Sequence, residues 1–388
     1  MSQQEDRTSY VIDRRDFQSL FDALTNKGYR LVGPTVRHGT VVYDQLTSVT
    51  DLPIGYQDQL ERGSYRLQKL DHQQLFAYTL SPHSWKKFLY PPTLRLWQAQ
   101  KYDGNFQFVP EQQAATPLAL IGVRACELNA IAIQDRIFLG GDYPDPLYKA
   151  QREKLFIVAV NCGHAGNTCF CASMKTGPKA DTGFDLGLTE VIQEEHHYFV
   201  VEAGSSAGAD ILSLLPHHPA TDEEIEAAAQ IVAQTTASMG RTLDTTDLKK
   251  FLYANYEHPH WDEIATRCLA CGNCTMVCPT CFCSTVEDVT DLRGESAERW
   301  RKWDSCFTTD FSYIVGGSIR ASVKSRYRQW MTHKLAAWID QFGTSGCVGC
   351  GRCITWCPVG IDITQEVAAM RAEQQLAAEP EGTAGERP

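Results

Sequence analysis

The chain has 388 residues, ordinary apolar and charged fractions and a formal net charge of −11. Its length is enough for two or three domains. The acidic balance argues against a general nucleic-acid-binding protein, because neutralising phosphates requires clustered Lys and Arg. Residues 1–6 lack the apolar core of a signal peptide, and no apolar run approaches the roughly 20 residues that span a bilayer. We therefore expect a cytoplasmic protein without a membrane span.

The first part of the chain alternates strand-like and helix-like segments. Asp16–Asn26 predicts a short helix, whereas Ser81–Pro92, with its aromatics and three prolines, predicts loop or edge structure. The runs Pro117–Val123 and Lys154–Val160 are apolar over the length of a strand, and a helical pattern at Glu127–Phe138 lies between them. Continuous apolar strands joined by a helix indicate parallel strands in an α/β core.

Two capped helices follow. Thr221 and Glu224 form the pattern of a capping box, which predicts a helix that ends near Gly240. A second helix is predicted from about Asp244 to Tyr256. We expect an α/β or α+β domain over residues 1–245, a second domain over 246–370 and a tail over 371–388. The tail is polar from Gln374 onward and is expected to be disordered.

Fifteen cysteines in a chain of this length need an explanation. A disulfide framework belongs to short secreted chains that carry a signal peptide. Here the count is odd, and most cysteines lie two to four residues from the next one. Such close neighbours are poorly placed to pair with each other, and their spacing favours a metal centre.

Eight of the cysteines form two runs of identical spacing, each followed by proline. The first run is Cys268-x-x-Cys271-x-x-Cys274-x-x-x-Cys278-Pro279, and the second is Cys347-x-x-Cys350-x-x-Cys353-x-x-x-Cys357-Pro358. In this pattern three cysteines hold one [4Fe–4S] cluster and the fourth ligates the other cluster of a two-cluster ferredoxin. Structural zinc more commonly takes two separated Cys pairs. We therefore predict two [4Fe–4S] clusters, one on Cys268, Cys271, Cys274 and Cys357, the other on Cys347, Cys350, Cys353 and Cys278.

The sequence around these runs indicates the type of domain. Gly272, Gly349 and Gly351 are expected to let backbone amides approach the cluster sulfides. The separation between the runs is too long for a compact β-hairpin ferredoxin, and Ser318–Asp340 within it is helix-prone. The second domain is therefore similar to an α-helical ferredoxin domain, as found in many respiratory iron–sulfur subunits. Two adjacent clusters predict an electron-transfer protein.

Between Arg293 and Lys334 basic residues outnumber acidic ones, against the trend of the whole chain. One interpretation is the solvated face of a helix. The other is a surface that docks a partner, or a positive environment that favours the reduced cluster. Both stay open.

Four further cysteines lie in the first part of the chain. Cys126 and Cys162 directly follow the two predicted parallel strands, and Cys169 and Cys171 lie in the loop after the second strand. Positions of this kind share the carboxyl edge of a parallel sheet, where ligands bind. We predict that the four cysteines hold a third [4Fe–4S] cluster, with His164 as a fallback ligand. The alternative is that some of them are small buried hydrophobic residues.

The remaining cysteines are Cys281, Cys283 and Cys306. They could complete a further site, line a cluster pocket or simply pack, and a low-pKa redox thiol is conceivable. We favour structural or supporting roles.

The motifs together resemble the β subunit of sulfhydrogenases, which are soluble NAD(P)-linked [NiFe] hydrogenases, and are similar also to the electron-transfer subunit of anaerobic sulfite reductase. The resemblance covers about residues 110–365 and leaves the first hundred unmatched. The motifs that carry it are Gly122-Val123-Arg124-x-Cys126, Asn161-Cys162, Thr168-Cys169-Phe170-Cys171 and Cys278-Pro279-Thr280-Cys281-Phe282-Cys283.

The resemblance implies an electron relay that runs in either direction. At one end is an NAD(P)H-oxidising flavin subunit, and at the other is a [NiFe] hydrogenase with its small and large subunits. The alternative is the relay of an anaerobic sulfite or sulfur reductase, whose partner is a sirohaem subunit. The eight cysteines of the two runs carry over as cluster ligands, and the four N-terminal cysteines also match the family's pattern.

The chain carries no recognisable nucleotide-binding motif, no Cys pairs of a [NiFe] site and no spacing that compels a Ser/His/Asp or Cys/His catalytic group. We therefore expect a subunit of an oxidoreductase with no active site of its own. An enzyme that reduces sulfur species at Cys281, Cys283 and Cys306 is the competing hypothesis.

Overall fold

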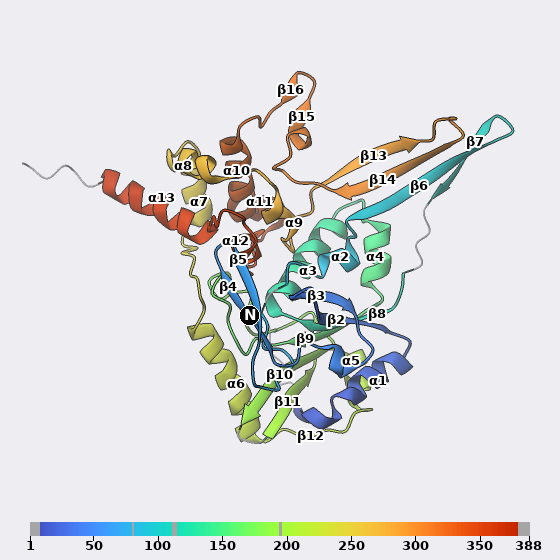
Figure 1. Cartoon of the computed structure of the whole chain (residues 1–388), viewed down its shortest axis with the longest axis vertical. Helices are drawn as coiled ribbons and strands as arrows, with labels where there is room; N and C mark the ends of the chain where they lie inside the picture. The colour runs from blue at the N-terminus through green and yellow to red at the C-terminus, as the bar shows by residue number, and fades with distance from the viewer. Residues whose placement is uncertain (1–7, 80, 111–114, 194–195, 379–388) are drawn as a thin grey trace, which may run out of the picture.

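The computed structural model describes residues 8–79, 81–110, 115–193 and 196–378, so the acidic residues 1–6 and the last ten residues of the predicted tail lie outside it. An eight-stranded mixed sheet occupies the lower half of the molecule in Figure 1. Four consecutive strands pair in parallel, and the remaining strands on either side pair antiparallel. Across the sheet the order is β12 (His218–Pro219), β1 (Ser9–Asp13), β11 (His196–Ala203), β10 (Leu186–Gln193), β9 (Leu155–Val160), β8 (Leu118–Val123), β2 (Arg30–Arg37) and β3 (Thr40–Gln45).

Helices cover both faces of this sheet. Successive side chains of a strand point to opposite faces. Ile121 and Val158 therefore pack on one side, beneath α1 (Gln18–Asn26) and α5 (Ser206–Leu212). Leu120 and Ile157 pack on the other side, beneath α2 (Lys86–Leu89), α3 (Ala125–Phe138) and α4 (Pro146–Arg152). The helical elements of this part are η1 (Arg14–Asp16), α1 (Gln18–Asn26), η2 (Val49–Asp51), α2 (Lys86–Leu89), α3 (Ala125–Phe138), α4 (Pro146–Arg152), α5 (Ser206–Leu212) and α6 (Asp222–Ala237).

The elements predicted in this part are confirmed with small shifts. The two apolar runs are β8 and β9, paired in parallel, and α3 connects them. Thr221 and Glu224 cap α6 reciprocally, with the Thr221 N–H donating to Glu224 Oε2 at 2.8 Å and the Glu224 N–H to Thr221 Oγ1 at 3.3 Å. The segment Ser81–Pro92, expected to be a loop or edge, contains the one-turn helix α2.

The C-terminal part is built mainly of short helices around a second core, which contains Trp261, Trp330 and Met331. This bears out the predicted α-helical domain that follows an α/β domain. No helix of the described ranges is long and apolar enough to cross a membrane. The helices are α7 (Leu248–Ala254), α8 (His260–Arg267), α9 (Asn273–Met276), η3 (Asp310–Ser312), α10 (Val323–Thr332), the π-helix η4 (His333–Ala337), α11 (Trp338–Phe342), α12 (Arg352–Thr355) and α13 (Ile363–Ala378).

Two expectations in this part are wrong. The helix expected from Asp244 to Tyr256 is shorter and consists of α7 alone. Asp247, the residue before α7, has a left-handed backbone, and the chain that precedes it is not helical. Residues 371–378 of the predicted tail are helical, because they continue α13, whose preceding turns pack Val367 and Met370 into the C-terminal core. The helix is therefore anchored just before the tail and extends into a segment whose composition alone indicates disorder.

A four-stranded sheet projects from the body as an arm at the upper right of Figure 1. Its strands β14 and β6 pair antiparallel, so the sheet joins segments on both sides of the predicted boundary at residue 245. A smaller hairpin of β15 (Tyr313–Ile314) and β16 (Gly317–Ser318) projects at the top. The remaining two-stranded sheet pairs β4 (Tyr56–Glu61) with β5 (Ser64–Lys69). In spatial order the arm consists of β13 (Ser284–Thr290), β14 (Ser296–Trp303), β6 (Thr93–Tyr102) and β7 (Asn105–Pro110).

The arm changes the interpretation of the basic segment. Arg299 and Lys302 lie on β14 and form ion pairs across the hairpin with acidic residues of β13, and Arg301 pairs with Asp145. These residues do not form a helix face, because they lie on a strand of a hairpin that was not expected there. Lys334, at the other end of the segment, is buried.

Candidate iron–sulfur centres

Cysteines from both Cys runs line one cavity between α9, α10 and α12. The other walls are largely apolar and include the rings of Phe307, Tyr327 and Trp330. Cys353, from the second run, also reaches this cavity. Apart from Cys353, four cysteines line the cavity, three from the first run and one from the second. This is the combination predicted for one cluster. These four, the first set, are Cys268, Cys271, Cys274 and Cys357.

The two runs fold alike because each turns at a glycine. Gly272 and Gly351 stand directly before α9 and α12 with φ of 73° and 76°, in the left-handed region that favours glycine. The turn places Cys274 and Cys353 at equivalent positions in the two one-turn helices. The shared Cys-Gly-x-Cys spacing therefore gives two similar half-sites, and α9 and α12 contact each other.

Backbone N–H groups approach the cysteine sulfurs, which suits thiolate ligands. The amide of Ala270 lies 3.4 Å from Cys268 Sγ, that of Gly349 3.4 Å from Cys347 Sγ, and that of Ile361 3.3 Å from Cys357 Sγ. Hydrogen bonds of this kind stabilise negative charge on cluster sulfurs. The thiols, the N–H donors and the apolar walls together fit a [4Fe–4S] cluster.

The second set combines Cys278 of the first run with three cysteines of the second. Burial is the main cause that raises the pKa of Cys353, and the next causes are its neighbours Cys347, Cys350 and Cys278. The same burial raises the pKa of Cys347 to about 12. The structure thus brings together the second predicted combination as well. Its members are Cys347, Cys350, Cys353 and Cys278.

A buried lysine lies against this second set. Lys334 of η4 is only 4% exposed and donates to Cys278 Sγ at 3.3 Å, to Thr280 Oγ1 at 3.2 Å and to the Gly346 carbonyl at 3.1 Å. Burial works against its charge, yet the neighbouring thiols, Cys278 first, hold the pKa of Lys334 well above its usual value. The sequence indicated positive charge in this segment but not which residue reaches a cluster ligand.

We expect Lys334→Met to lower the midpoint potential of one cluster by about 60 mV, the equivalent of ~1.4 kcal/mol for a one-electron couple. An ammonium group that donates to a ligand sulfur stabilises the reduced, more negative cluster, so its removal disfavours reduction. Redox titration followed by electron paramagnetic resonance measures the shift. Lys324→Met, on the exposed ion pair with Asp262, is the matched control and should leave all potentials unchanged. Equal shifts in both variants would show that only overall charge matters.

The four N-terminal cysteines also converge. Cys126 lies in the first turn of α3, Cys162 follows β9, and Cys169 and Cys171 lie in the loop before β10. Burial is the main cause that raises the pKa values of Cys169 and Cys126. The next causes are the neighbouring Cys171 and Cys162 for Cys169, and the neighbouring Cys171 for Cys126. These four cysteines, the third set, therefore face one another at the carboxyl edge of β8 and β9, as the parallel strands predicted. His164 instead lines a groove with Asp58 and Asn167.

The loop that carries Cys169 and Cys171 packs directly on the second Cys run. The Phe170 N–H donates to the Gly349 carbonyl at 2.8 Å. A Cβ at Gly349 would lie 2.6 Å from the Phe170 carbonyl, so only glycine allows this approach, and Gly349 also has a φ of 64°. Cys350 is close enough to raise the pKa of both Cys126 and Cys171. The second and third sets are thus neighbours.

A fully buried ion pair joins these two sets. Arg352 Nη2 lies 2.8 Å from Glu127 Oε1, and both side chains are 1% exposed. Arg352 Nε also donates to the Ser81 carbonyl at 2.8 Å, and Tyr43 Oη donates to Glu127 Oε2 at 3.0 Å. Arg352 neighbours Cys353, and Glu127 neighbours Cys126, so the pair fixes the second Cys run against α3. Sequence analysis missed both residues, although each adjoins a predicted ligand.

The three remaining cysteines lie beside the clusters' cysteines. Cys281 Sγ is 3.5 Å from Lys334 Nζ. Cys283 precedes β13 and Cys306 follows β14, and the Asp304 N–H donates to the Cys283 carbonyl at the base of that hairpin. A hydrogen bond from Cys306 lowers the pKa of Cys283 to about 7. These two thiols therefore form a close pair, which sequence spacing did not indicate.

The spacing of the cysteines does not suit zinc. A tetrahedral zinc ion with Zn–S bonds of ~2.3 Å needs sulfurs roughly 3.8 Å apart. In the part of the chain that the structure describes, which includes every cysteine, no three cysteine sulfurs lie within 4.8 Å of one another. The sets are therefore too wide for a single ion and leave room for a larger group.

The fold and these cysteine sets define an iron–sulfur protein of the dicluster type, and residues 267–361 match the 4Fe-4S dicluster domain family. Over 349 residues the chain is 29% identical to sulfhydrogenase 2 subunit beta of Pyrococcus furiosus, across 89% of this chain and 93% of that protein. The resemblance to a sulfhydrogenase β subunit is thus confirmed. The similarity to that protein also extends into the first hundred residues, for which the motifs showed no resemblance. No solved structure matches the chain.

Proposed function

We propose that the chain is the electron-transfer subunit of a multisubunit oxidoreductase. It relays electrons between an NAD(P)H-oxidising flavin subunit at one end and a [NiFe] hydrogenase, made of a small and a large subunit, at the other. The observation that carries the proposal is the convergence of twelve cysteines into three adjoining sets of four. Similarity to a sulfhydrogenase β subunit supports the choice of partners. When bound, a [4Fe–4S] cluster takes up and releases one electron.

The chain's own residues supply what such a relay requires. The second set is enclosed, with Cys278, Cys347 and Cys350 buried, which keeps water away. In the first set Cys271 is exposed, and Leu269 beside it is exposed as well. The first set therefore offers an edge at the surface through which electrons can enter or leave.

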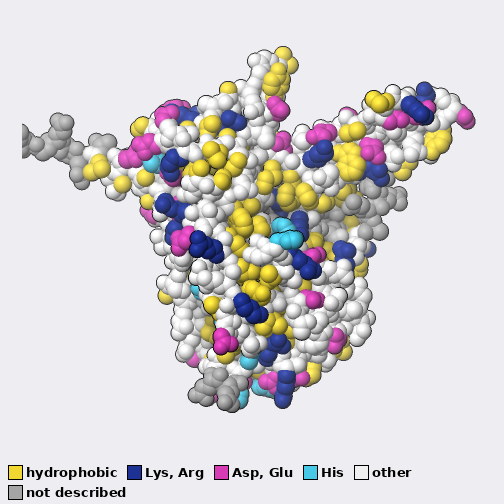
Figure 2. Space-filling view, in the orientation of Figure 1, with side chains coloured by type: hydrophobic (Ala, Val, Ile, Leu, Met, Phe, Trp, Pro, Cys, Tyr) yellow, Lys and Arg dark blue, Asp and Glu magenta, His cyan; other side chains and the backbone are white. Residues whose placement is uncertain are grey.

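Exposed apolar surface supports a role in a complex. Figure 2 shows hydrophobic side chains in a band that runs down the middle of this face, from the helical part toward the large sheet. Large apolar side chains are also exposed on both projections, for example Leu292 in the arm hairpin and Val315 between β15 and β16. Contiguous exposed apolar surface commonly marks a protein–protein interaction site.

Counting iron tests the number of clusters. Three clusters predict about 12 irons and 12 acid-labile sulfides per chain, whereas two predict about 8. Cys126→Ser should lower the iron content by about 4 without affecting the other clusters. Anaerobic iron and sulfide determination on the purified chain measures this. An unchanged iron content in this variant would exclude a cluster on the third set, and Cys306→Ser is the matched control outside all three sets.

Affinity purification of the native complex tests the partners. We expect both [NiFe] subunits and the flavin subunit to copurify with the chain. Recovery of a sirohaem subunit in their place would assign the chain to an anaerobic sulfite reductase, the alternative relay. Mass spectrometry of the purified complex distinguishes these two results.

A second candidate function rests on the Cys283–Cys306 pair. The hydrogen bond from Cys306 lowers the pKa of Cys283 and therefore favours its thiolate, which is the nucleophilic form. Such a pair, next to a source of electrons, suits the reduction of sulfur species. The purified chain with reduced viologen and polysulfide should then release sulfide, and Cys306→Ser should abolish the release. An inactive wild-type chain would leave the relay as its sole function.

A further inference from the structure

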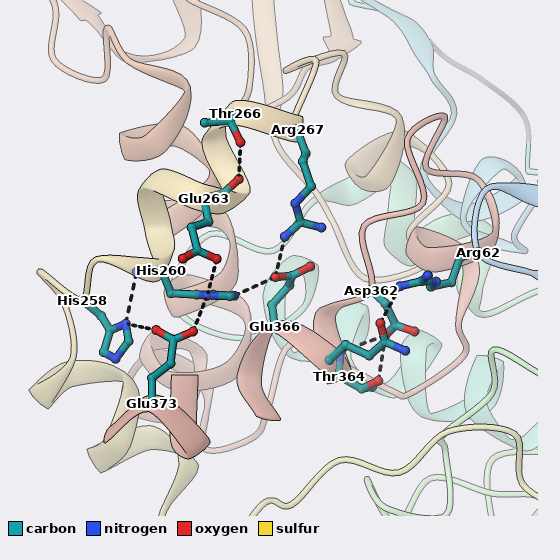
Figure 3. Close-up of polar contacts among 11 residues, drawn as sticks. Arg62, His258, His260, Glu263, Thr266, Arg267, Asp362, Thr364, Glu366 and Glu373 are labelled. Atoms are coloured by element: carbon teal, nitrogen blue, oxygen red, sulfur yellow. Dashed lines mark hydrogen bonds and ion pairs between the residues drawn. The ribbon is translucent and has the colours of Figure 1, made fainter. Parts of the chain in front are cut away.

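Two histidines and three glutamates, none of them adjacent in sequence to a cysteine, gather between α8 and α13 (Figure 3). His260 and Glu263 belong to α8, and Glu373 belongs to α13. One ligand atom from each of these three residues lies within 4.8 Å of the other two. Figure 3 shows His258 beside Glu373 and Glu366 on the far side of the His260 ring.

One nitrogen of His260 has a clear partner. His260 Nε2 lies 2.8 Å from Glu366 Oε2, and both side chains are 6% exposed. The same carboxylate oxygen also accepts from Arg267 Nη2 at 2.8 Å. An ionised Glu366 can only accept, so it holds the proton of His260 on Nε2. Carboxylates orient metal-binding histidines in this way, by hydrogen-bonding the nitrogen that does not touch the metal.

The other nitrogen points at two carboxylates without a hydrogen bond. His260 Nδ1 lies 2.9 Å from Glu373 Oε1 and 3.3 Å from Glu263 Oε2, but it is a buried atom with no hydrogen-bond partner of acceptable geometry. With the proton on Nε2, Nδ1 presents a lone pair to two acceptors, which repel it. A cation among the three atoms turns this repulsion into coordination.

We propose that His260 Nδ1, Glu263 and Glu373 bind one divalent transition-metal ion of the zinc class. One imidazole and two carboxylates are suitable ligands for such ions, whereas Mg²⁺ and Ca²⁺ take oxygen ligands. Glu263 is 69% exposed and Glu373 39%, so the ion can enter from solvent. His258 Nδ1 accepts a hydrogen bond from the His260 N–H at 3.2 Å and so helps to fix the start of α8.

The position of the site indicates what the ion does. The helix α8 ends immediately before Cys268, the first ligand of the first Cys run, and α13 follows the second run. An ion held by both helices therefore clamps together the two ends of the dicluster region. It acts as a structural brace and requires no change of oxidation state.

Zinc binding to the cluster-loaded, chelator-treated protein tests the site. Equilibrium dialysis against Zn²⁺ should give one zinc per chain with unchanged iron. X-ray absorption at the zinc edge should show nitrogen and oxygen ligands at about 2.0–2.1 Å and no sulfur at about 2.3 Å. A sulfur shell would mean that zinc occupies cysteines, and no zinc above background would mean that His260, Glu263 and Glu373 bind no ion. Either result overturns the proposal.

Matched variants locate the ion. Glu263→Gln changes an exposed residue and should leave the fold intact while zinc affinity falls at least about tenfold, the lower end of the loss expected when metal-site groups are removed. His260→Gln should abolish binding. Asp262→Asn, the neighbouring carboxylate on α8 that pairs with Lys324, is the control and should bind zinc like the wild type. Unchanged affinity in Glu263→Gln would exclude this site.

Discussion

Replacing Cys347 and Cys357 together with alanine is expected to remove about eight irons from each chain, whereas replacing Cys268 and Cys357 together should remove only about four. The reason is the proposed crossed ligation, in which Cys357 belongs to the cluster of the first run. Cys268 and Cys357 then serve one cluster, and a second substitution there removes nothing more. Anaerobic iron and sulfide determination on folded protein measures the loss.

The opposite pattern has an equally clear meaning. If each run holds its own cluster, the Cys268 and Cys357 pair costs about eight irons and the Cys347 and Cys357 pair about four. Cys283→Ala, outside the three sets, is the matched control and should retain all iron. The cavity geometry supports the crossed arrangement, because Cys357 lines the same cavity as Cys268.

Glu127→Gln is expected to destabilise the protein by about 3–5 kcal/mol, because it leaves Arg352 charged and buried without its partner. Arg352→Met should cost a similar amount for the converse reason. The double variant Glu127→Gln/Arg352→Met removes both charges and should recover part of the loss. The midpoint of anaerobic urea unfolding measures the change for the cluster-loaded protein.

Arg299→Met provides the control for this experiment. Its ion pair with Asp288 is exposed, and such pairs contribute only about 0–1 kcal/mol. A loss in Glu127→Gln no larger than in this control would show that the buried pair does not hold the second Cys run against α3. Additive losses in the double variant would show that the two side chains act independently.

The sequence predicted those features that depend on neighbouring residues. The spacing within each Cys run and the glycine before each one-turn helix are local, and they indicated a dicluster domain. The apolar runs of β8 and β9 are continuous because both faces of those strands are covered, which made their parallel pairing predictable. That pairing in turn placed Cys126 and Cys162 on one edge. The capping box at Thr221 was equally local.

Features that depend on distant pairing were not predictable. The arm was missed because β6 and β14 are half-exposed, mostly polar strands whose pairing partners lie far away in the sequence. The helical start of the tail was missed because its composition is polar, and its helix is anchored by Met370, which packs into the core just before it.

The sequence by itself determined the two four-cysteine runs of a dicluster domain, since ligand type and local spacing are written in consecutive residues. Only the tertiary structure decided how the three sets adjoin, which lysine touches Cys278, and that His260 meets Glu373 across two helices. These contacts join residues far apart in the chain, and their positions depend on how whole elements pack. Burial then changes the chemistry of these side chains, because it raises the free energy of a charged group and of a nitrogen without a hydrogen-bond partner.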